Sequence, residues 1–142
     1  MKSLSTQMIE EVRRKVDHFS YYAQGEASVH YMTICKALRV FEEMEGYARN
    51  AFIGAPNETE IENVAEDVQE KCDQALRYFG GSVGIIAALR NKDIRKHVHL
   101  LEEAYDSLRL YSEALQKAAK AEGLASLGER PYRIGVSTNV NG

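Results

Sequence analysis

Apolar residues recur at every third or fourth position along most of this chain, from Ile9 to Leu115. This spacing places them on one face of a helix, so it predicts amphipathic α-helices that pack against one another. Only Pro56 and Pro131 interrupt the chain, which leaves room for long helices. The pattern predicts an all-α fold: an antiparallel helical bundle of four long helices plus one short buried helix, with an extended C-terminal arm.

The first stripe covers residues 5–23 and a second covers residues 27–52, with Gly25 between them. The two stripes are nearly in register, so Gly25 is either a turn or a weak point within one long helix. An unbroken helix over residues 5–52 would be about 72 Å long. A domain of this size has a radius of gyration of about 14 Å, so we favour a break at Gly25.

The clearest helix start lies just after the first proline. Asn57 can cap a helix, and Glu60 stands three residues later, which is the spacing of a capping box. This third helix is expected to end at Gly80 and Gly81, because glycine readily adopts the left-handed conformation that closes a helix. Residues 83–89 then predict a short helix that is apolar on every side and is therefore buried.

Asp93 is the expected cap of the last long helix, whose stripe continues to Gly123. Beyond it, apolar and polar residues alternate over residues 132–140, which is typical of an extended segment. We therefore divide the chain into a helical bundle domain, residues 1–123, and an extended C-terminal arm, residues 124–142. A tail without a sheet of its own is either loose or laid onto a neighbouring molecule, and we favour the second.

Composition narrows the function classes only a little. A length of 142 residues corresponds to one domain, and a net charge of −3 argues against general electrostatic binding to nucleic acids. Cys35 and Cys72 lie on or beside apolar helical positions, so we interpret both as reduced core residues. The sequence contains no apolar run of about 18 residues, and residues 1–11 lack the apolar stretch of a signal peptide, so the expected location is cytoplasmic.

The sequence contains no recognisable metal or cofactor motif. Di-iron bundles use Glu-x-x-His pairs, and no Glu stands three residues before any of the four histidines. The glycine run at Gly80, Gly81 and Gly84 lacks the Lys and Ser/Thr of a phosphate-binding P-loop. We therefore expect no metal, no cofactor and no membrane partner.

Positive charge is concentrated at the start of the last helix, where the net charge over residues 90–99 is +3. A helix N-terminus is already partly positive, so this concentration indicates an anion or an acidic partner, such as a phosphate-containing ligand or RNA. The alternative interpretation is a solvated charged face. The candidate ligand-binding residues, called the basic cluster below, are Arg90, Lys92, Arg95, Lys96, His97 and His99.

Within this cluster, Arg90, Asn91 and His97 resemble the Arg-x(4-6)-His motif of HEPN ribonucleases, which are also small helical bundles. In that family the Arg and His of two protomers meet across a dimer interface and cut RNA without a metal. The resemblance implies that Arg90 stabilises a phosphate, that His97 transfers a proton, and that Asn91 is the polar residue that follows the Arg. It covers eight residues of the chain, and short motifs recur by chance.

Negative charge gathers on the third helix, where residues 58–73 carry a net charge of −6. An acidic helix and a basic cluster in one chain can pair within a protomer or between protomers, and repeated pairing builds a ring or a stack. We also expect the apolar stripes to be larger than one subunit can hide. The leading hypothesis is a non-enzymatic helical assembly protein of bacterial or phage type that forms a homo-oligomer. The alternative is an anion- or nucleotide-binding protein, in its enzymatic form a HEPN-like ribonuclease.

Overall fold

A computed structural model describes residues 2–129, and this part of the chain is helical apart from short connections and contains no strand. The predicted all-α bundle of four long helices plus one short helix is confirmed. The long helices are α1 (Leu4–Phe19), α2 (Glu26–Gly54), α3 (Glu58–Ala87) and α5 (Val98–Glu129); a 3₁₀ turn, η1 (Ser20–Tyr22), follows α1, and the short helix α4 (Lys92–Lys96) precedes α5.

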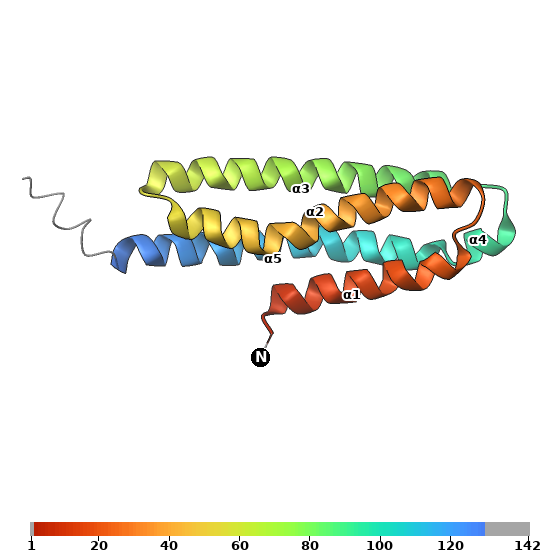
Figure 1. Cartoon of the computed structure of the whole chain (residues 1–142), viewed down its shortest axis with the longest axis horizontal. Helices are drawn as coiled ribbons and strands as arrows, with labels where there is room; N and C mark the ends of the chain where they lie inside the picture. The colour runs from red at the N-terminus through yellow and green to blue at the C-terminus, as the bar shows by residue number, and fades with distance from the viewer. Residues whose placement is uncertain (1, 130–142) are drawn as a thin grey trace, which may run out of the picture.

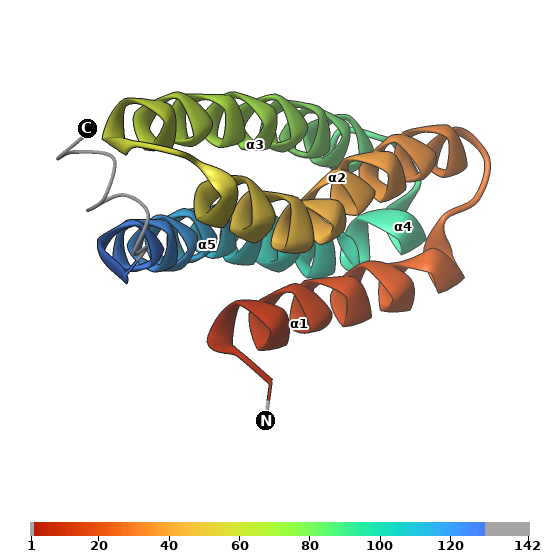
Figure 2. The same cartoon turned by 60° about the vertical axis from the view of Figure 1, so that its left-hand side comes forward.

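The long helices run up and down along one axis, so that successive long helices are antiparallel (Figure 1). α2, α3 and α5 pack against one another in all three pairs, whereas α1 packs mainly on α5 and only lightly on α2. α1 and α3 lie on opposite sides of the molecule in both views (Figure 1, Figure 2). Because α1 has only 16 residues and α2 has 29, α1 covers only part of the groove between α2 and α5.

The break predicted at Gly25 is confirmed. α1 ends at Phe19, four residues earlier than the stripe indicated, because η1 tightens the chain before the turn. Gly25 has φ 59° and ψ −130°, a conformation that is open to glycine and strained for other residues. The hydroxyl of Ser28 donates to the Gly25 carbonyl over 2.7 Å. The chain therefore reverses direction between α1 and α2.

The start of α3 is as predicted, but its end is not. The Asn57 side chain accepts a hydrogen bond from the backbone N–H of Glu60 at 2.9 Å. α3 then continues through Gly80 and Gly81, so the expected helix end at these glycines is wrong. A Cβ at Gly80 would stand 2.8 Å from the ring of Tyr105 on α5. This glycine therefore permits a close approach of two helices and does not end one.

The short buried helix predicted over residues 83–89 is wrong for the same reason. Most of this segment forms the last turns of α3, and Ile85 is exposed there instead of buried. The short helix of the fold is α4, in which Ile94 is the buried residue. An apolar run can thus be the end of a long helix when no cap separates it from the preceding turns.

The last helix also begins and ends later than predicted. Asn91 caps α4, whereas Asp93 lies inside it, and α5 starts only at Val98. α5 continues past Gly123 to Glu129, so residues 124–129 are helical and do not belong to an extended arm. A Cβ at Gly123 would stand 2.8 Å from the carbonyl oxygen of Phe52, so this glycine sits where α5 crosses α2 closely. The rest of the predicted arm, residues 130–142, lies outside the described residues.

One chain buries nearly all of the predicted stripes by itself. A single core cluster contains residues from all five helices, including Val12, Leu38, Phe79, Ile94 and Leu108. Of the stripe residues in the described range, two stay exposed, Ile85 and Ala118. The expectation that the stripes are larger than one subunit can hide is therefore wrong, because the helices turn these faces inward around a complete core.

Both cysteines are free thiols, as expected from their apolar positions. Cys72 is fully buried, and burial raises the pKa of its thiol. A thiol that is protonated and shielded from solvent is a poor nucleophile. Cys72 is therefore a packing residue of the core.

Candidate functional site

The basic cluster lies at one end of the bundle, where α3 ends and α5 begins (Figure 1). Asn91 accepts hydrogen bonds from the backbone N–H groups of Asp93 at 2.9 Å and Ile94 at 3.2 Å. These bonds fix the first turn of α4. Because Ile94 is anchored in the core, the opposite face of α4 is directed outward. Asn91, one of the residues in the HEPN-like motif, thus has a structural role as a helix cap.

Lys92, Arg95 and Lys96 occupy the outward face of α4. Together with Ala87 and Val98 they line a hollow of about 520 Å³. Within residues 2–129, none of these three side chains makes an ion pair. The structure therefore brings three of the candidate ligand-binding residues together around one hollow and leaves their charges available for an anion.

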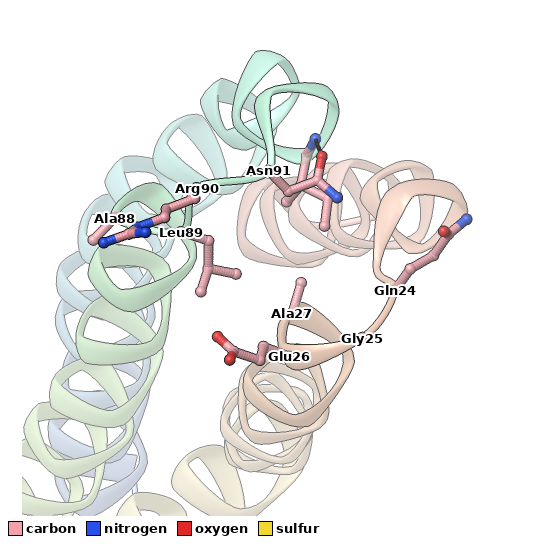
Figure 3. A pocket seen from close by; sticks show the side chains of 9 residues that line it. Gln24, Gly25, Glu26, Ala27, Ala88, Leu89, Arg90 and Asn91 are labelled. Carbon is pink, nitrogen blue, oxygen red and sulfur yellow. Dashed lines mark hydrogen bonds between the residues drawn. The ribbon is translucent and has the colours of Figure 1, made fainter.

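Arg90 is one of the residues that line a second hollow, of about 660 Å³, beside the turn between α1 and α2 (Figure 3). Leu89 and Ala27 contribute apolar side chains to this hollow, and Gly25 contributes backbone. In Figure 3 the Arg90 side chain turns back over the end of α3 toward Ala88. The Arg90 guanidinium is thus directed away from the middle of this hollow, and it makes no ion pair with another described residue.

The two histidines of the basic cluster make different contacts. The ring of His97 stacks on the ring of Tyr22, with centroids 3.5 Å apart and planes inclined by 12°. His99 is exposed, and its Nδ1 lies 3.1 Å from the backbone carbonyl oxygen of Lys96. His97 therefore ties the end of η1 to the start of α5, while the Arg90 side chain turns over the end of α3. The HEPN resemblance pairs these two residues between protomers, so their catalytic roles stay a prediction.

The acidic half of α3 is partly paired within the chain. Glu62 accepts a hydrogen bond from the ammonium group of Lys120 on α5. The hydroxyl of Tyr47 donates to Asp67 over 2.7 Å and, with the nearby Lys71 ammonium, holds the pKa of that carboxyl below its usual range. Among residues 2–129, no group of three or more His, Cys, Asp or Glu side chains is arranged to hold a metal ion.

A surface that the sequence pattern did not single out runs along α2 and α3, on the side of α2 that faces away from α1. A groove of about 610 Å³ lies between the two helices. Val40 and Ala37 line it from α2, and Ala75 and Tyr78 line it from α3. The lining residues at its polar positions are Thr33, Lys36, Lys71 and Gln74. The groove is therefore mostly apolar and carries basic side chains.

Protruding apolar side chains continue this surface toward the α4 end. Tyr78 is 58% exposed, and Ile85, two helical turns further along α3, is 46% exposed. On α2, Val29 lies two turns before Lys36 and is 64% exposed, and its neighbour Met32 is 60% exposed. We call the groove together with Val29, Met32, Tyr78 and Ile85 the α2–α3 surface. Large apolar side chains that gather in this way mark interaction sites more often than singly exposed ones do.

The sequence carried a weak signal for this surface. Val29 and Met32 lie outside the stripe that contains Ala27 and Ile34, so α2 has more apolar residues than one buried face requires. On α3, the exposed Tyr78 lies next to the buried Phe79, so the stripe of α3 is also wider than its buried face. An apolar stripe wider than the core face is therefore the feature of the sequence that indicates this surface.

The groove on the other side of α2, between α2 and α5, holds α1, and we call it the α1 groove. Its centre is a polar network around Glu45, which accepts hydrogen bonds from Ser5 of α1 at 2.8 Å and from Tyr111 of α5 at 3.0 Å. Tyr111 is fully buried, and burial together with the adjacent Glu45 carboxylate raises its pKa. Further along, Arg13 of α1 forms a two-pronged ion pair with Glu42. The α1 groove is thus closed by a satisfied polar network.

No helix formed by residues 2–129 has the combination of length and apolar character needed to cross a membrane. The chain matches no protein-family model, no curated protein and no solved structure.

Proposed function

We propose that this protein is a non-enzymatic helical interaction protein that forms a homo-oligomer through the α2–α3 surface. The observation that carries the proposal is the exposure of Val29, Met32, Tyr78 and Ile85 beside an apolar groove on one side of the bundle. Removing such side chains from water is favourable by about 25 cal/mol per Å² of apolar area, so a partner that covers them gains stability.

A second copy of this chain suits the surface because groove and protrusions lie next to each other on the same two helices. A two-fold rotation about an axis between them places the protruding side chains of each copy over the groove of the other. Lys71 does not oppose this contact, since its charge is balanced by Asp67 at 3.4 Å. Lys36 is exposed, and its long stem allows the ammonium group to reach solvent at the rim.

The test is size-exclusion chromatography with light scattering at micromolar concentration. Wild-type protein is expected to elute as an oligomer, and Tyr78→Glu is expected to elute as a monomer because it places a charge in the contact. Leu110→Glu is the matched control, since Leu110 is 57% exposed on α5, away from the α2–α3 surface. A wild-type protein that is monomeric at these concentrations, whatever the salt, contradicts the proposal.

A second candidate function is anion binding at the basic cluster. The specific observation that favours it is the hollow lined by Lys92, Arg95 and Lys96, whose charges have no ion-pair partner among residues 2–129. Planar guanidinium and ammonium groups that converge in this way suit phosphate oxygens. The ligand class would be a phosphate-containing molecule, either a nucleotide or RNA.

This candidate is tested by thermal unfolding with a panel of nucleotides and a short RNA. A ligand that binds the folded protein raises its melting temperature, and the rise should vanish in the triple variant Lys92→Gln, Arg95→Gln, Lys96→Gln. Lys36→Gln is the control, because Lys36 lies on α2 away from the cluster. Cleavage of the RNA that is lost in both Arg90→Ala and His97→Ala would favour the ribonuclease form; RNA that stays intact with the wild type excludes that form.

A further inference from the structure

Helix α1 packs mainly on α5, which is far from it in sequence, and its polar contacts with Glu42 and Glu45 of α2 lie away from the turn that joins the two helices. Against α2 it packs only lightly. Its polar contacts also reach distant positions: Lys15 pairs with Glu103 of α5 at 3.7 Å, and Ser5 donates to Glu45 far along α2. The connection to α2 therefore contributes little to holding α1 in the α1 groove. Any α1 that reaches the groove could make the same contacts.

The apolar pattern of α1 continues into α2 without a change of phase. Positions three or four residues apart follow one another through the turn, including Ala23 and Tyr31, which are half-buried. Consecutive members of this stripe are Ser5, Ile9, Val12, Val16, Phe19, Ala23, Ala27, Tyr31, Ile34, Leu38 and Phe41. A straight helix over residues 5–52 would keep them all on one face and would be about 72 Å long. A helix of that length projects beyond its own bundle.

Two features keep the chain folded back instead. Gly25 holds the positive φ of 59° that the reversal needs, and a Cβ at this position would meet no atom within 4 Å. The ring stack of Tyr22 on His97 fastens the end of η1 to the start of α5. One backbone conformation and one stacked pair at the connection thus favour the folded-back form, and the Tyr31 hydroxyl, which donates to the Val16 carbonyl over 3.0 Å, joins α2 to α1 across the turn.

We infer that α1 is an exchangeable element and that two copies of this chain can form a dimer in which α1 of each packs in the α1 groove of the other. The contacts of α1 with α5, Glu42 and Glu45 are then made between chains in the same geometry, so they are not lost. The backbone conformation of residues 20–25 changes: these residues become helical and join α1 and α2 into one continuous helix. This inference concerns the α1 groove and is independent of the α2–α3 surface.

The exchange can be detected by a zero-length cross-link between isotope-labelled copies. Protein labelled with ¹⁵N is co-refolded with unlabelled protein, the dimer fraction is isolated, and carbodiimide couples Lys15 to Glu103, whose charged atoms lie 3.7 Å apart. Mass spectrometry of the cross-linked peptides then shows whether the two halves carry different labels. The ion pair of Lys120 with Glu62 is the internal control, because it joins α5 to α3 within one chain in either form.

Exchange predicts that mixed-label Lys15–Glu103 peptides appear in the dimer fraction, from the dimers that contain one copy of each label, while every Lys120–Glu62 peptide carries a single label. Gly25→Ala is expected to raise the dimer fraction about tenfold, because alanine is strained at positive φ and favours helix. Gly46→Ala is the matched control, since Gly46 lies within α2 and has no positive φ. Tyr22→Ala, which removes the stack on His97, is a second variant with the same expected direction.

Two results overturn the inference. One is a dimer fraction whose Lys15–Glu103 peptides carry only one label each, as a dimer held by the α2–α3 surface alone would give. The other is the absence of dimer in the wild type, in Gly25→Ala and in Tyr22→Ala alike. Conversely, mixed-label peptides from a dimer that Tyr78→Glu does not disrupt would support exchange and contradict the proposed role of the α2–α3 surface.

Discussion

The two grooves beside α2 differ in how they are filled. In the α1 groove, α1 covers the contact of α2 with α5, and the polar groups of Glu45 and Tyr111 are hydrogen-bonded to each other. In the groove between α2 and α3, no element of residues 2–129 covers Val40 and Tyr78, which line it. α2 thus has one side that is covered by α1 and another side that no described helix covers.

Because of this difference, substitutions on the two sides of α2 should affect different properties: folding on the filled side and association on the open side. Groups on the filled side are desolvated in the folded chain, so changes there should alter the free energy of unfolding. Side chains on the open side are already in contact with water, so changes there should leave that free energy nearly constant and should alter contacts with a partner. The two sides can therefore be tested by opposite readouts.

The largest effect is expected from a truncation at the contact of α2 with α5. Phe41 is fully buried and its ring packs against that of Tyr111, with centroids 6.2 Å apart. Phe41→Ala should lower the free energy of unfolding by about 3–5 kcal/mol, measured by urea denaturation, because it leaves a cavity. Tyr78→Ser on the open side should change it by less than about 0.5 kcal/mol when the protein is dilute enough to be monomeric, since association would add to the apparent stability. Equal losses in the two variants would contradict the comparison.

A smaller effect is expected from the crossing of α5 over α2. Gly123→Ala places a Cβ 2.8 Å from the carbonyl oxygen of Phe52, and backbone cannot give way as a flexible side chain does. The expected loss is about 1–3 kcal/mol of unfolding free energy. Gly46→Ala, on the solvent side of α2 with no atom within 4 Å, should instead gain about 0.5–1 kcal/mol. Thermal or urea unfolding of the two alanine variants checks the opposite signs.

The smallest effect concerns the buried hydroxyl of Tyr111. Tyr111→Phe removes the hydrogen bonds to Glu45 and to the Phe41 carbonyl, with an expected loss of about 1 kcal/mol near neutral pH. The raised pKa of Tyr111 favours its neutral form in the folded chain, so its stabilising effect is present below about pH 10 and falls as the pH rises above that value. Urea midpoints of wild type and variant should therefore converge at alkaline pH. A constant difference across this range would argue against the buried hydroxyl as the titrating group.

The helical architecture could be predicted because it depends on spacing that is local in sequence. The break at Gly25 and the cap at Asn57 follow from backbone preferences that neighbouring residues do not override. The helix ends predicted at Gly80 and Gly123 are wrong. Each glycine instead allows another helix to approach closely, at Tyr105 for Gly80 and at Phe52 for Gly123. A close approach between distant segments leaves no mark in the local pattern.

The candidate site was predictable only in part. Lys92, Arg95 and Lys96 share a short helix, so their convergence on one hollow could follow from sequence proximity. The separate placements of Arg90 and His97 depend on the turn at Gly25 and on Tyr22, which come from another part of the chain. The residues that flank the motif of Arg90 and His97 in sequence therefore do not predict either placement.

Hydrophobic period and backbone preference are local properties of the chain. They are therefore enough to predict that it forms long amphipathic helices, where two of these helices begin, and where the first reverses into the second. Which apolar faces become buried does not follow from these local properties. Burial depends on which helix lies opposite, and the pairing of α1 with α5, across most of the chain, left one side of α2 filled and the other open.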